Sequence, residues 1–484
     1  MNELVAFGLA VLLAGVAGMA AVLSNRLSER LRVPAPAVFL VCAAVASDLS
    51  PRLGRVSVHA VEQVVTVALA VILFDGGAHI GWRRFRTATA ATLWLGTAGT
   101  LVTTGAVAAL AHLLFGFGWR SALLLGAALA PTDPAVVFSV LGRRQVAGRS
   151  GVLLEGESGV NDPVGIALLV SLLATGGLGG AVLEFVVQLV VGVVVGVLGG
   201  RLLLVVMRRV PLPSEGLYPL RVLAGMLVIF GAATVARGSG FLAVFVAGIL
   251  LGDERAPYKG EIERFHGALA SLAELVAFVL LGLTVPLHRL PDQRTWLVGL
   301  ALAVLLTLLV RPLLVGLLLW PVRLGRGERA FVLWTGLKGA VPILLGTFIL
   351  QAHATDAARL YGVIFVVVAF SVLVQGGLVP GLARRLGVPL RAVEPEPWSL
   401  GVRFRHEPRG LRRYLVVAGS PADGRAIGEL DLGEDAWISL VIRDGQLVPV
   451  QGATILRAGD EVIVLTDPER TPDLAPVFTA PTSS

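Results

Sequence analysis

An acidic segment lies inside a long apolar run of this sequence, and its side chains could bind an ion or a proton. The segment Glu157–Pro163 carries two carboxylates, on Glu157 and Asp162. A carboxylate at membrane depth costs about 2.5–3.5 kcal/mol on insertion scales, so such a group marks a functional site. Ser158 and Asp162 are four residues apart and share a helix face, and Asn161 adjoins them. Together these polar groups predict a site for a small bare cation or a proton.

The elements that must position these groups are membrane helices. Of the 484 residues, 55% are hydrophobic and only 15% are charged, which indicates a polytopic membrane protein. The net charge of +7 fits arginine-rich cytoplasmic loops, and no soluble basic face suggests nucleic-acid binding. The single cysteine, Cys42, lies in an apolar run, so disulfides play no part.

Apolar runs bounded by charges, proline and glycine predict about thirteen transmembrane helices on the ~20-residue rule. The runs begin near Leu4, Pro34, Ala60, Ala88, Arg120, Val152, Ala181, Leu217, Gly240, Phe265, Trp296, Ala330 and Tyr361. No cleavage site follows the first run, which we therefore interpret as a retained helix from about Leu4 to Leu23. Arginine clusters in alternate gaps, which favours an odd number of spans with the N-terminus outside and the C-terminus inside.

Two of these spans, the fifth and the twelfth, are interrupted in mid-membrane. The first break contains Asp133 within Ala130–Pro134, and the second contains Lys338 within Gly336–Pro342. Corresponding broken helices in two halves of a chain indicate a transporter's binding site. They predict two six-helix inverted repeats joined by the seventh span. A simple proline kink would explain the prolines but not a charge at each break.

Other charged residues at membrane depth have expected roles around this site. An unpaired Arg311 in mid-span would be very unfavourable, and Glu157 is its expected partner. Asp75 fits either a supporting role or a solvated acid at a helix end. Glu274 fits equally a wall of a cytoplasmic funnel and a pairing role, while Glu155 is expected to face water.

The composition changes after about Pro395. Residues 396–484 are charged and contain no spanning run. Turn signals separate short strand-like pieces. These pieces are Tyr414–Val417, Trp437–Ile442, Leu447–Val448 and Glu461–Leu465, with a short helix expected at Ala426–Leu430. The pattern predicts a small soluble α+β domain on the cytoplasmic side.

Four ordered motifs in the membrane region carry a family resemblance. They are Phe-Asp-Gly-Gly, Thr-Asp-Pro, Glu-Ser-x-x-Asn-Asp and Gly-Leu-Lys-Gly-Ala-Val-Pro. To about residue 390 the chain resembles the Asn-Asp branch of monovalent cation/proton antiporters, which includes NhaP-type bacterial proteins and animal sodium/proton exchangers. From about Tyr414 to Asp467, and most clearly over Asp435–Leu465, it resembles a TrkA-C (RCK C-terminal) domain. The combination is similar to bacterial potassium/proton antiporters of the NhaP type.

The resemblance implies a domain plan for the whole chain. We expect a transmembrane cation/proton antiporter domain at residues 1–393 and a linker at 394–413. A cytoplasmic TrkA-C-like regulatory domain is expected at 414–470, followed by a flexible tail at 471–484.

The resemblance also implies a role for each residue of the cation site. Asp162 would bind either the cation or the proton, with Ser158 and Glu157 adding oxygens or structure near it. The backbone carbonyl of Thr132 would complete the cation shell. Asn161 occupies the position where electrogenic relatives carry a second Asp, which implies one-for-one exchange.

Around that site, Asp133 and Lys338 would balance half-helix ends, Glu157 would pair with Arg311, and Asp75 would support the site. Relatives usually have arginine at the position of Lys338. Because the charge of a buried lysine is less fixed than that of arginine, this departure leaves strict electroneutrality open.

The expected function is electroneutral exchange of a monovalent cation for a proton by alternating access, in the cell inner membrane. Potassium is favoured by the tail, and sodium fits the same oxygen ligands. We expect no cofactor beyond the transported cation and proton, and no enzymatic activity. The family resemblance suggests a homodimer. The tail could bind a small ligand or act as a structural dimer cap.

Two other classes of protein are less consistent with the sequence. A tail-gated channel would need a selectivity filter, and the sequence contains no repeated Thr-Val-Gly-like loop. A non-transporting sensor should have lost Asp162 or the break around Asp133, and both are present.

Overall fold

The computed structural model describes residues 34–49, 57–141, 144–146, 148–174, 177–254, 258–322, 324–392, 411–433, 436–444, 446–466 and 474–479, with isolated residues 8, 12, 15, 18 and 19. The chain divides into two compact units, Met1–Val393 and Glu394–Ser484. The helix expected from Leu4 to Leu23 and the linker expected at 394–413 lie almost entirely outside the described residues.

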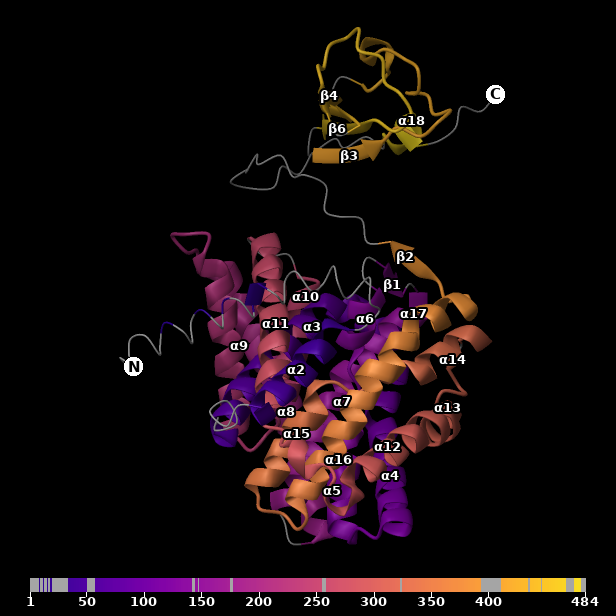
Figure 1. The fold of residues 1–484 in the computed structure, drawn as a ribbon. Helices are drawn as coiled ribbons and strands as arrows, with labels where there is room; N and C mark the ends of the chain where they lie inside the picture. The colour runs from indigo at the N-terminus through magenta and orange to yellow at the C-terminus, as the bar shows by residue number, and fades with distance from the viewer. Residues whose placement is uncertain are drawn as a thin grey trace. The chain divides into compact units, whose positions relative to one another are not determined.

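The first unit is built from α-helices, several of them continued by π-helical segments (Figure 1). The helices are α2 (Ala35–Leu49), α3 (Val58–Trp94), α4 (Thr100–Phe115), α5 (Trp119–Leu129), α6 (Pro134–Leu141), α7 (Gly148–Ala174), α8 (Leu178–Arg209), α9 (Leu217–Val235), α10 (Gly240–Gly252), α11 (Lys259–Leu283), α12 (Thr295–Leu305), α13 (Gly316–Leu318), α14 (Arg326–Trp334), α15 (Ala340–Gln351), α16 (Ala357–Phe370) and α17 (Gly376–Arg385). The π-helical segments are η2 (Leu95–Gly99), η5 (Leu306–Val315) and η6 (Ser371–Gln375). Strands β1 (Arg144–Val146) and β2 (Leu390–Ala392) pair antiparallel.

Within the described residues, seven helical stretches are long and apolar enough to cross a membrane, and three shorter apolar helices accompany them. The longest stretch, Val58–Phe115, contains a break at Gly81, whose φ of 64° favours glycine. A Cβ atom at Gly81 would lie 2.7 Å from the Asp253 carboxylate. The unit is therefore a polytopic helical membrane domain, and the predicted thirteen spans and inverted repeat stay predictions.

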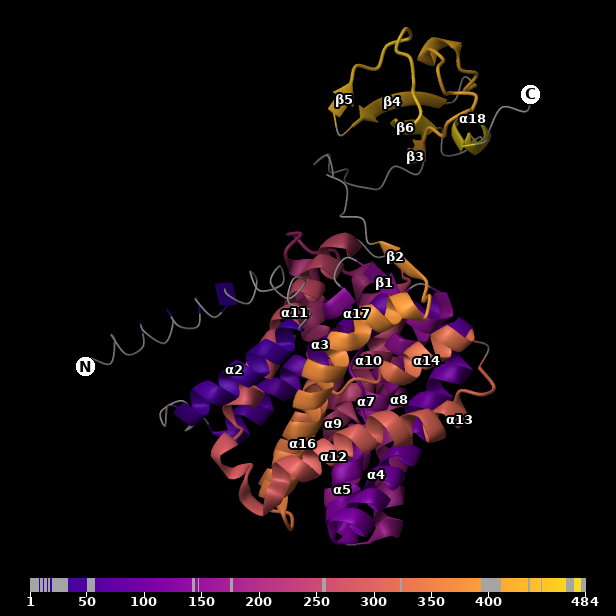
Figure 2. The same ribbon diagram turned by 45° about the vertical axis from the view of Figure 1, so that its right-hand side comes forward.

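The helices pack as two groups. We call α2, α8–α11 and residues 58–80 of α3 the α10 group, because α10 packs on α3 and α8 while α11 packs on α3 and α2. We call α4–α7 and α12–α17 the α7 group, in which α4 packs on α5, α5 on α7, and α12 and α15 on α16. Figure 2 shows α2 beside α11 and, apart from them, α4 beside α5.

The two groups meet along α7 and α15. Phe245 of α10 packs so closely on α7 that a Cβ atom at Gly159 would lie 2.3 Å from its ring. Helix α15 contacts both α3 and α11 of the α10 group. Small residues permit this close approach of backbones, as is typical of helices packed in lipid.

The second unit contains a four-stranded antiparallel sheet in the order β3-β6-β4-β5. Its strands are β3 (Leu411–Leu415), β4 (Ala436–Arg443), β5 (Gln446–Val448) and β6 (Glu461–Thr466). A 3₁₀ turn, η7 (Ile427–Glu429), replaces the short helix expected there. Alternate residues of β6 are buried, which gives the sheet one core face.

The folded part of the second unit extends beyond the boundary predicted at residue 470. Helix α18 (Ala475–Thr479) buries Phe478 in the core, and the ring of Phe478 stacks on Tyr414 with centroids 5.0 Å apart. The expectation of a flexible tail from residue 471 is therefore wrong for Ala475–Thr479. The prediction failed because a helix of only five residues gives little periodic signal in the sequence.

Candidate functional site

Two interrupted helices cross at the centre of the α7 group. Helix α5 ends at Leu129 and α6 begins at Pro134, while α14 ends at Trp334 and α15 begins at Ala340. The Asp133 backbone amide donates to the Leu337 carbonyl over 2.8 Å, so the two non-helical segments touch. Each break leaves backbone groups without helical partners, and these groups need charges or other hydrogen bonds in the membrane.

Lys338 satisfies the carbonyls at the end of α5. Its buried ammonium donates to the carbonyl oxygens of Ala130 and Pro131, each over 2.9 Å. A positive charge at a helix C-terminus is stabilising, because the helix dipole is negative there. The Lys338 backbone amide in turn donates to the Ser371 hydroxyl over 2.9 Å.

Asp133 lies at the N-terminal ends of two helices, α6 and α15. Its carboxylate accepts a hydrogen bond from the Ala135 backbone amide over 2.9 Å, at the start of α6. A Cβ atom at Gly339 would lie 1.7 Å from Asp133 Oδ2, so the same carboxylate rests on the residue that precedes α15. Helices α6 and α15 therefore both begin beside the Asp133 carboxylate. A negative charge is stabilising there, because the N-terminus is the positive end of a helix dipole.

Asp162 lies on α7 beside the first break. Its side chain is buried, and Oδ1 has no hydrogen-bond partner among the described residues. Ser158, one turn earlier, donates its hydroxyl to the Thr132 carbonyl oxygen. Asn161 also bonds Thr132, so four of the predicted site residues come together. The Asp162 carboxylate is left free for a ligand from outside the protein.

Glu157 and Arg311 form a buried ion pair, with Nη2 and Oε1 3.0 Å apart. Arg311 Nε also donates to the Leu333 carbonyl over 2.9 Å, and Nη2 lies 3.3 Å from the Val332 carbonyl. Arg311 therefore caps the end of α14 as Lys338 caps the end of α5. A Cβ atom at Gly336 would lie 1.9 Å from the guanidinium, so glycine is required beside it.

Sequence reasoning missed a polar network on the last helix. The Gln375 side chain donates to the Trp334 carbonyl over 2.5 Å and accepts from the Ser371 hydroxyl over 3.0 Å. Thr307 on η5 also donates to Gln375, over 3.3 Å. Because Ser371 accepts the Lys338 amide, this network holds both ends of the second break. The signal in the sequence was two polar residues four apart in an apolar span.

The remaining acidic residues lie around this centre. Asp75 Oδ2 lies 3.2 Å from His79 Nδ1 in an i, i+4 pair, and among the described residues it forms no hydrogen bond with the Asp162 cluster. Glu274 Oε1 is buried and has no partner among the described residues. Glu155 lines a cavity of about 630 Å³ together with Arg84 and Arg149. The supporting role of Asp75 stays a prediction. So do the two roles considered for Glu274, as a wall of a cytoplasmic funnel or as a partner of another charge.

The arrangement combines a free buried carboxylate with hydroxyl, amide and carbonyl oxygens. A carboxylate in this environment needs a proton or a cation, because an isolated buried charge is very costly. Oxygen ligands suit a hard monovalent cation. Among the described residues, no group of three or more His, Cys, Asp and Glu side chains could hold a metal ion.

The chain is similar to known proteins over most of its length. Residues 16–385 match the family model of the transmembrane sodium/hydrogen exchanger, and residues 411–479 match the TrkA-C domain. The K(+)/H(+) antiporter NhaP of Alkalimonas amylolytica is 32% identical, over 99% of this chain and 85% of the relative. The K(+)/H(+) antiporter NhaP2 of Shewanella oneidensis is 34% identical, over 92% of this chain and 79% of the relative.

A solved structure supports the fold of the membrane unit. The sodium proton antiporter MjNhaP1 from Methanocaldococcus jannaschii matches 78% of this chain and 100% of its own, with a TM-score of 0.66 and 23% identity. The fold and the site define a multi-pass membrane transporter. The chain belongs to the sodium/hydrogen exchanger family and carries a C-terminal TrkA-C domain.

Proposed function

We propose that this protein exchanges potassium for protons, one for one, by alternating access at Asp162. The observation that carries the proposal is the buried Asp162 carboxylate, whose Oδ1 has no hydrogen-bond partner among the described residues. It lies one turn after Ser158, which bonds Thr132 at the crossing of two broken helices. A proton and a cation would compete for this carboxylate. Because a bare charge would cross the membrane at great cost, the carrier moves only with Asp162 neutralised.

In the cation-loaded state, the Asp162 carboxylate and the oxygens of Ser158 and Thr132 would surround the dehydrated ion. In this structure the Ser158 hydroxyl donates to the Thr132 carbonyl. That hydrogen bond would break so that both oxygens could turn to the cation. In the proton-loaded state, the Asp162 carboxyl is neutral and this hydrogen bond holds the break closed.

One-for-one exchange is supported by the side chains around Asp162. Asn161 uses its carboxamide to bond Thr132 and adds no second carboxylate. Asp133 and Lys338 are occupied by helix ends, and Glu157 pairs with Arg311. Within this cluster of Asp133, Glu157 and Asp162, Asp162 is then the carboxylate that exchanges a proton for a cation in each cycle.

The choice of potassium rests on similarity. Relatives named K(+)/H(+) antiporters match both the membrane unit and the tail of this chain. Sodium is the alternative, because the family of the membrane unit is named for sodium/hydrogen exchange and the same oxygen ligands can bind either ion. In that alternative the tail serves as a structural cap.

We further propose thirteen spans arranged as two inverted repeats around the seventh. The corresponding breaks between α5 and α6 and between α14 and α15, in the fifth and twelfth predicted spans, support this symmetry. Arginine placement supports an external N-terminus and a cytoplasmic TrkA-C domain in the inner membrane. The tail would regulate transport, and the protein would act as a homodimer.

Exchange in proteoliposomes tests the proposal. The purified protein is reconstituted with an internal pH indicator, and potassium, sodium, lithium or rubidium is added across a range of pH values. We expect potassium to move protons fastest and the rates to be independent of an imposed membrane potential. A faster response to sodium would change the assigned cation, and proton movement with no added cation would contradict exchange. Truncation near Val393 then tests the tail.

A further inference from the structure

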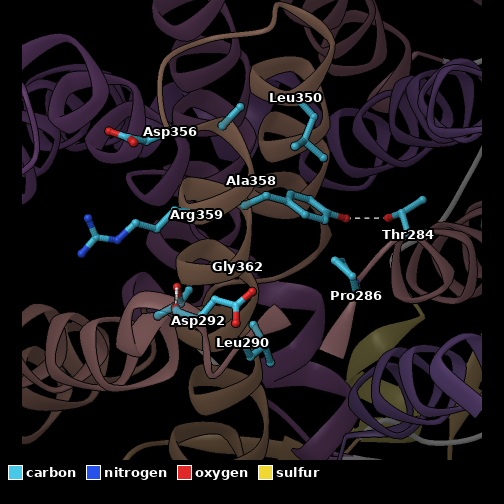
Figure 3. Close-up of a pocket in the computed structure, with 12 residues that line it drawn as sticks. Thr284, Pro286, Leu290, Asp292, Leu350, Asp356, Ala358, Arg359 and Gly362 are labelled. Carbon is cyan, nitrogen blue, oxygen red and sulfur yellow. Dashed lines mark hydrogen bonds between the residues drawn. The ribbon is translucent and has the colours of Figure 1, made fainter. Parts of the chain in front are cut away.

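A second cavity, of about 640 Å³, lies where the two helix groups meet at the end of α15 (Figure 3). Thr284 and Pro286, which follow α11 of the α10 group, line one side. Leu350 of α15 and Tyr361 of α16, from the α7 group, line another. By the proposed topology, this end of the membrane unit faces outside.

One hydrogen bond crosses this cavity from group to group. The hydroxyls of Tyr361 and Thr284 lie 2.5 Å apart. The dashed line that ends at Thr284 in Figure 3 marks this bond. Thr284 already donates its proton to the Leu281 carbonyl over 2.7 Å, so Tyr361 is the donor. Tyr361 is only 1% exposed, and its ring packs on Gly346, where a Cβ atom would lie 2.6 Å away. A rigid, buried phenol therefore ties α16 to the end of α11.

A second tie joins the same two groups nearby. Gln351, the last residue of α15, donates to Glu62 of α3 over 2.5 Å. Its amide oxygen lies 3.2 Å from His59 Nδ1, also on α3. Gln351 directly follows Leu350, which lines the cavity, so both ties lie at the same end of the molecule.

These ties are mechanically linked to the ion site. Helix α15 runs from the crossing beside Asp133 to Gln351, a length of about 18 Å at 1.5 Å per residue. A movement that separates the α7 group from the α10 group at this end would break both cross-group bonds. On the far side of the cavity, where Figure 3 shows Asp292, Asp356 and Arg359, the two aspartates are exposed to water, and Arg359 is half-buried over the ring of Phe117.

We propose that this cavity is the outer vestibule for hydrated monovalent cations, and that the Tyr361–Thr284 and Gln351–Glu62 bonds form the gate that separates it from Asp162. The inference rests on the proposed alternating access. In this structure the gate is closed. Opening it requires the two groups to separate at this end, which exposes the path along α15 to the broken helices.

Cross-linking tests whether the gate must open for exchange. In a Cys42→Ala background, Gln351→Cys and Glu62→Cys are joined by a short bis-methanethiosulfonate reagent, which forms a disulfide with each cysteine that a reductant can cleave. We expect exchange to fall by about tenfold or more and to recover on reduction, because a locked gate stops the cycle. The control pair is Ser121→Cys with Thr355→Cys, which lie together within the α7 group, where Ser121 donates to the Thr355 carbonyl over 3.1 Å. Undiminished exchange in the cross-linked gate pair would overturn the proposal.

A labelling measurement tests the gate without relying on transport. Thr347 is fully buried on α15, three residues before Leu350 and on the same helix face. A Thr347→Cys reporter is exposed to a membrane-impermeant maleimide added from one side at a time. Tyr361→Phe keeps the ring but loses the bond, and should raise labelling from the outer side about fivefold.

Tyr218→Phe is the matched control, because the Tyr218 hydroxyl accepts the Leu212 amide within the α10 group. It should leave labelling of the Thr347→Cys reporter unchanged. Equal labelling in the Tyr361→Phe protein and its parent would contradict the gate even if exchange is normal. A protein that labels as expected but exchanges no cation would instead contradict the proposed function.

Discussion

Asn161 and Thr132 exchange two hydrogen bonds across the break between α5 and α6. Asn161 Nδ2 donates to the Thr132 hydroxyl over 2.7 Å, and the Thr132 backbone amide donates to Asn161 Oδ1 over 3.3 Å. The residue next to Asp162 on α7 therefore fixes the conformation of the broken helix. The same carboxamide that stands in place of a second carboxylate also shapes the cation site.

Replacing Asn161 with leucine should weaken cation binding. The substitution keeps the volume but leaves the buried Thr132 amide and hydroxyl unpaired, at a cost of about 1–3 kcal/mol. We expect the apparent cation affinity in proteoliposomes to fall on the order of tenfold. Asn161→Asp is the informative counterpart, because it keeps an acceptor for Thr132 but adds a charge. The exchange rate of Asn161→Asp should respond to an imposed membrane potential. If this rate were independent of the potential, residue 161 would not set the ratio of protons to cations.

The Glu157–Arg311 pair should matter most for stability. Arg311→Met or Glu157→Gln removes one charge and leaves the other buried without its ionic partner. We expect a loss of about 3–5 kcal/mol in the free energy of unfolding. Arg311→Met should be the more damaging change, because it also uncaps the end of α14. Thermal unfolding in detergent measures both variants and the double variant. The double variant should lose less than the sum of the singles, and strict additivity would show that the pair does not act as a unit.

The sequence predicted the Glu157–Arg311 pair and the two helix breaks, because charges in a membrane are so costly. Asp162, Asp133, Lys338 and Arg311 stand out against apolar spans, and the pairing of Arg311 with Glu157 follows from the need to neutralise both. The prolines and glycines around Asp133 and Lys338 predicted two breaks, and the structure has a break at each place.

Features that depend on distant packing could not be predicted in the same way. Ser371 and Gln375 look like ordinary polar residues of a last span, and only the fold brings them to Trp334 and Lys338. The gate bonds of Tyr361 and Gln351 join helices far apart in the chain, so no local spacing reveals them. The same holds for the π-helical segments, which no simple periodicity distinguishes from α-helix.

Ser371 should position Lys338. Ser371→Ala removes the acceptor for the Lys338 backbone amide and a donor to Gln375, so the second break loosens. We expect the apparent cation affinity to fall about fivefold, at a cost of about 1–3 kcal/mol for the unpaired groups. Ser371→Thr keeps the hydroxyl and should restore wild-type affinity. Thr347→Val is the control, because the Thr347 hydroxyl donates to the Leu344 carbonyl within α15 itself. Equal losses in Ser371→Ala and Thr347→Val would indicate a general packing defect.

The TrkA-C unit should lose stability in acid through Asp460. Burial acts to raise the pKa of this carboxyl, but hydrogen bonds from Arg443 and from the Arg457 backbone outweigh burial and hold the pKa below its usual value. A lowered folded-state pKa stabilises the fold at every pH above the unfolded value of about 3.9. That contribution is lost as the pH falls through the folded-state pKa.

Hydrogen exchange in the full-length protein checks this pH dependence. Peptides covering β4 and β6 should lose protection below about pH 4, after correction for the intrinsic pH dependence of exchange. Asp460→Asn cannot ionise and should be less protected at neutral pH, with a weaker response to acid. An acid response in Asp460→Asn as steep as that of the parent would assign the effect to other groups.

The most direct test of the account is exchange by the Asp162→Asn protein in proteoliposomes. The control is Glu184→Gln, which removes a carboxylate that pairs with Arg237 away from the crossing. We expect Asp162→Asn to be folded and inactive, with cation-driven proton movement at the level of empty liposomes, because no group remains to trade a proton for a cation. Glu184→Gln should exchange at the wild-type rate. A folded Asp162→Asn protein that exchanged cations for protons at the wild-type rate would contradict the central claim.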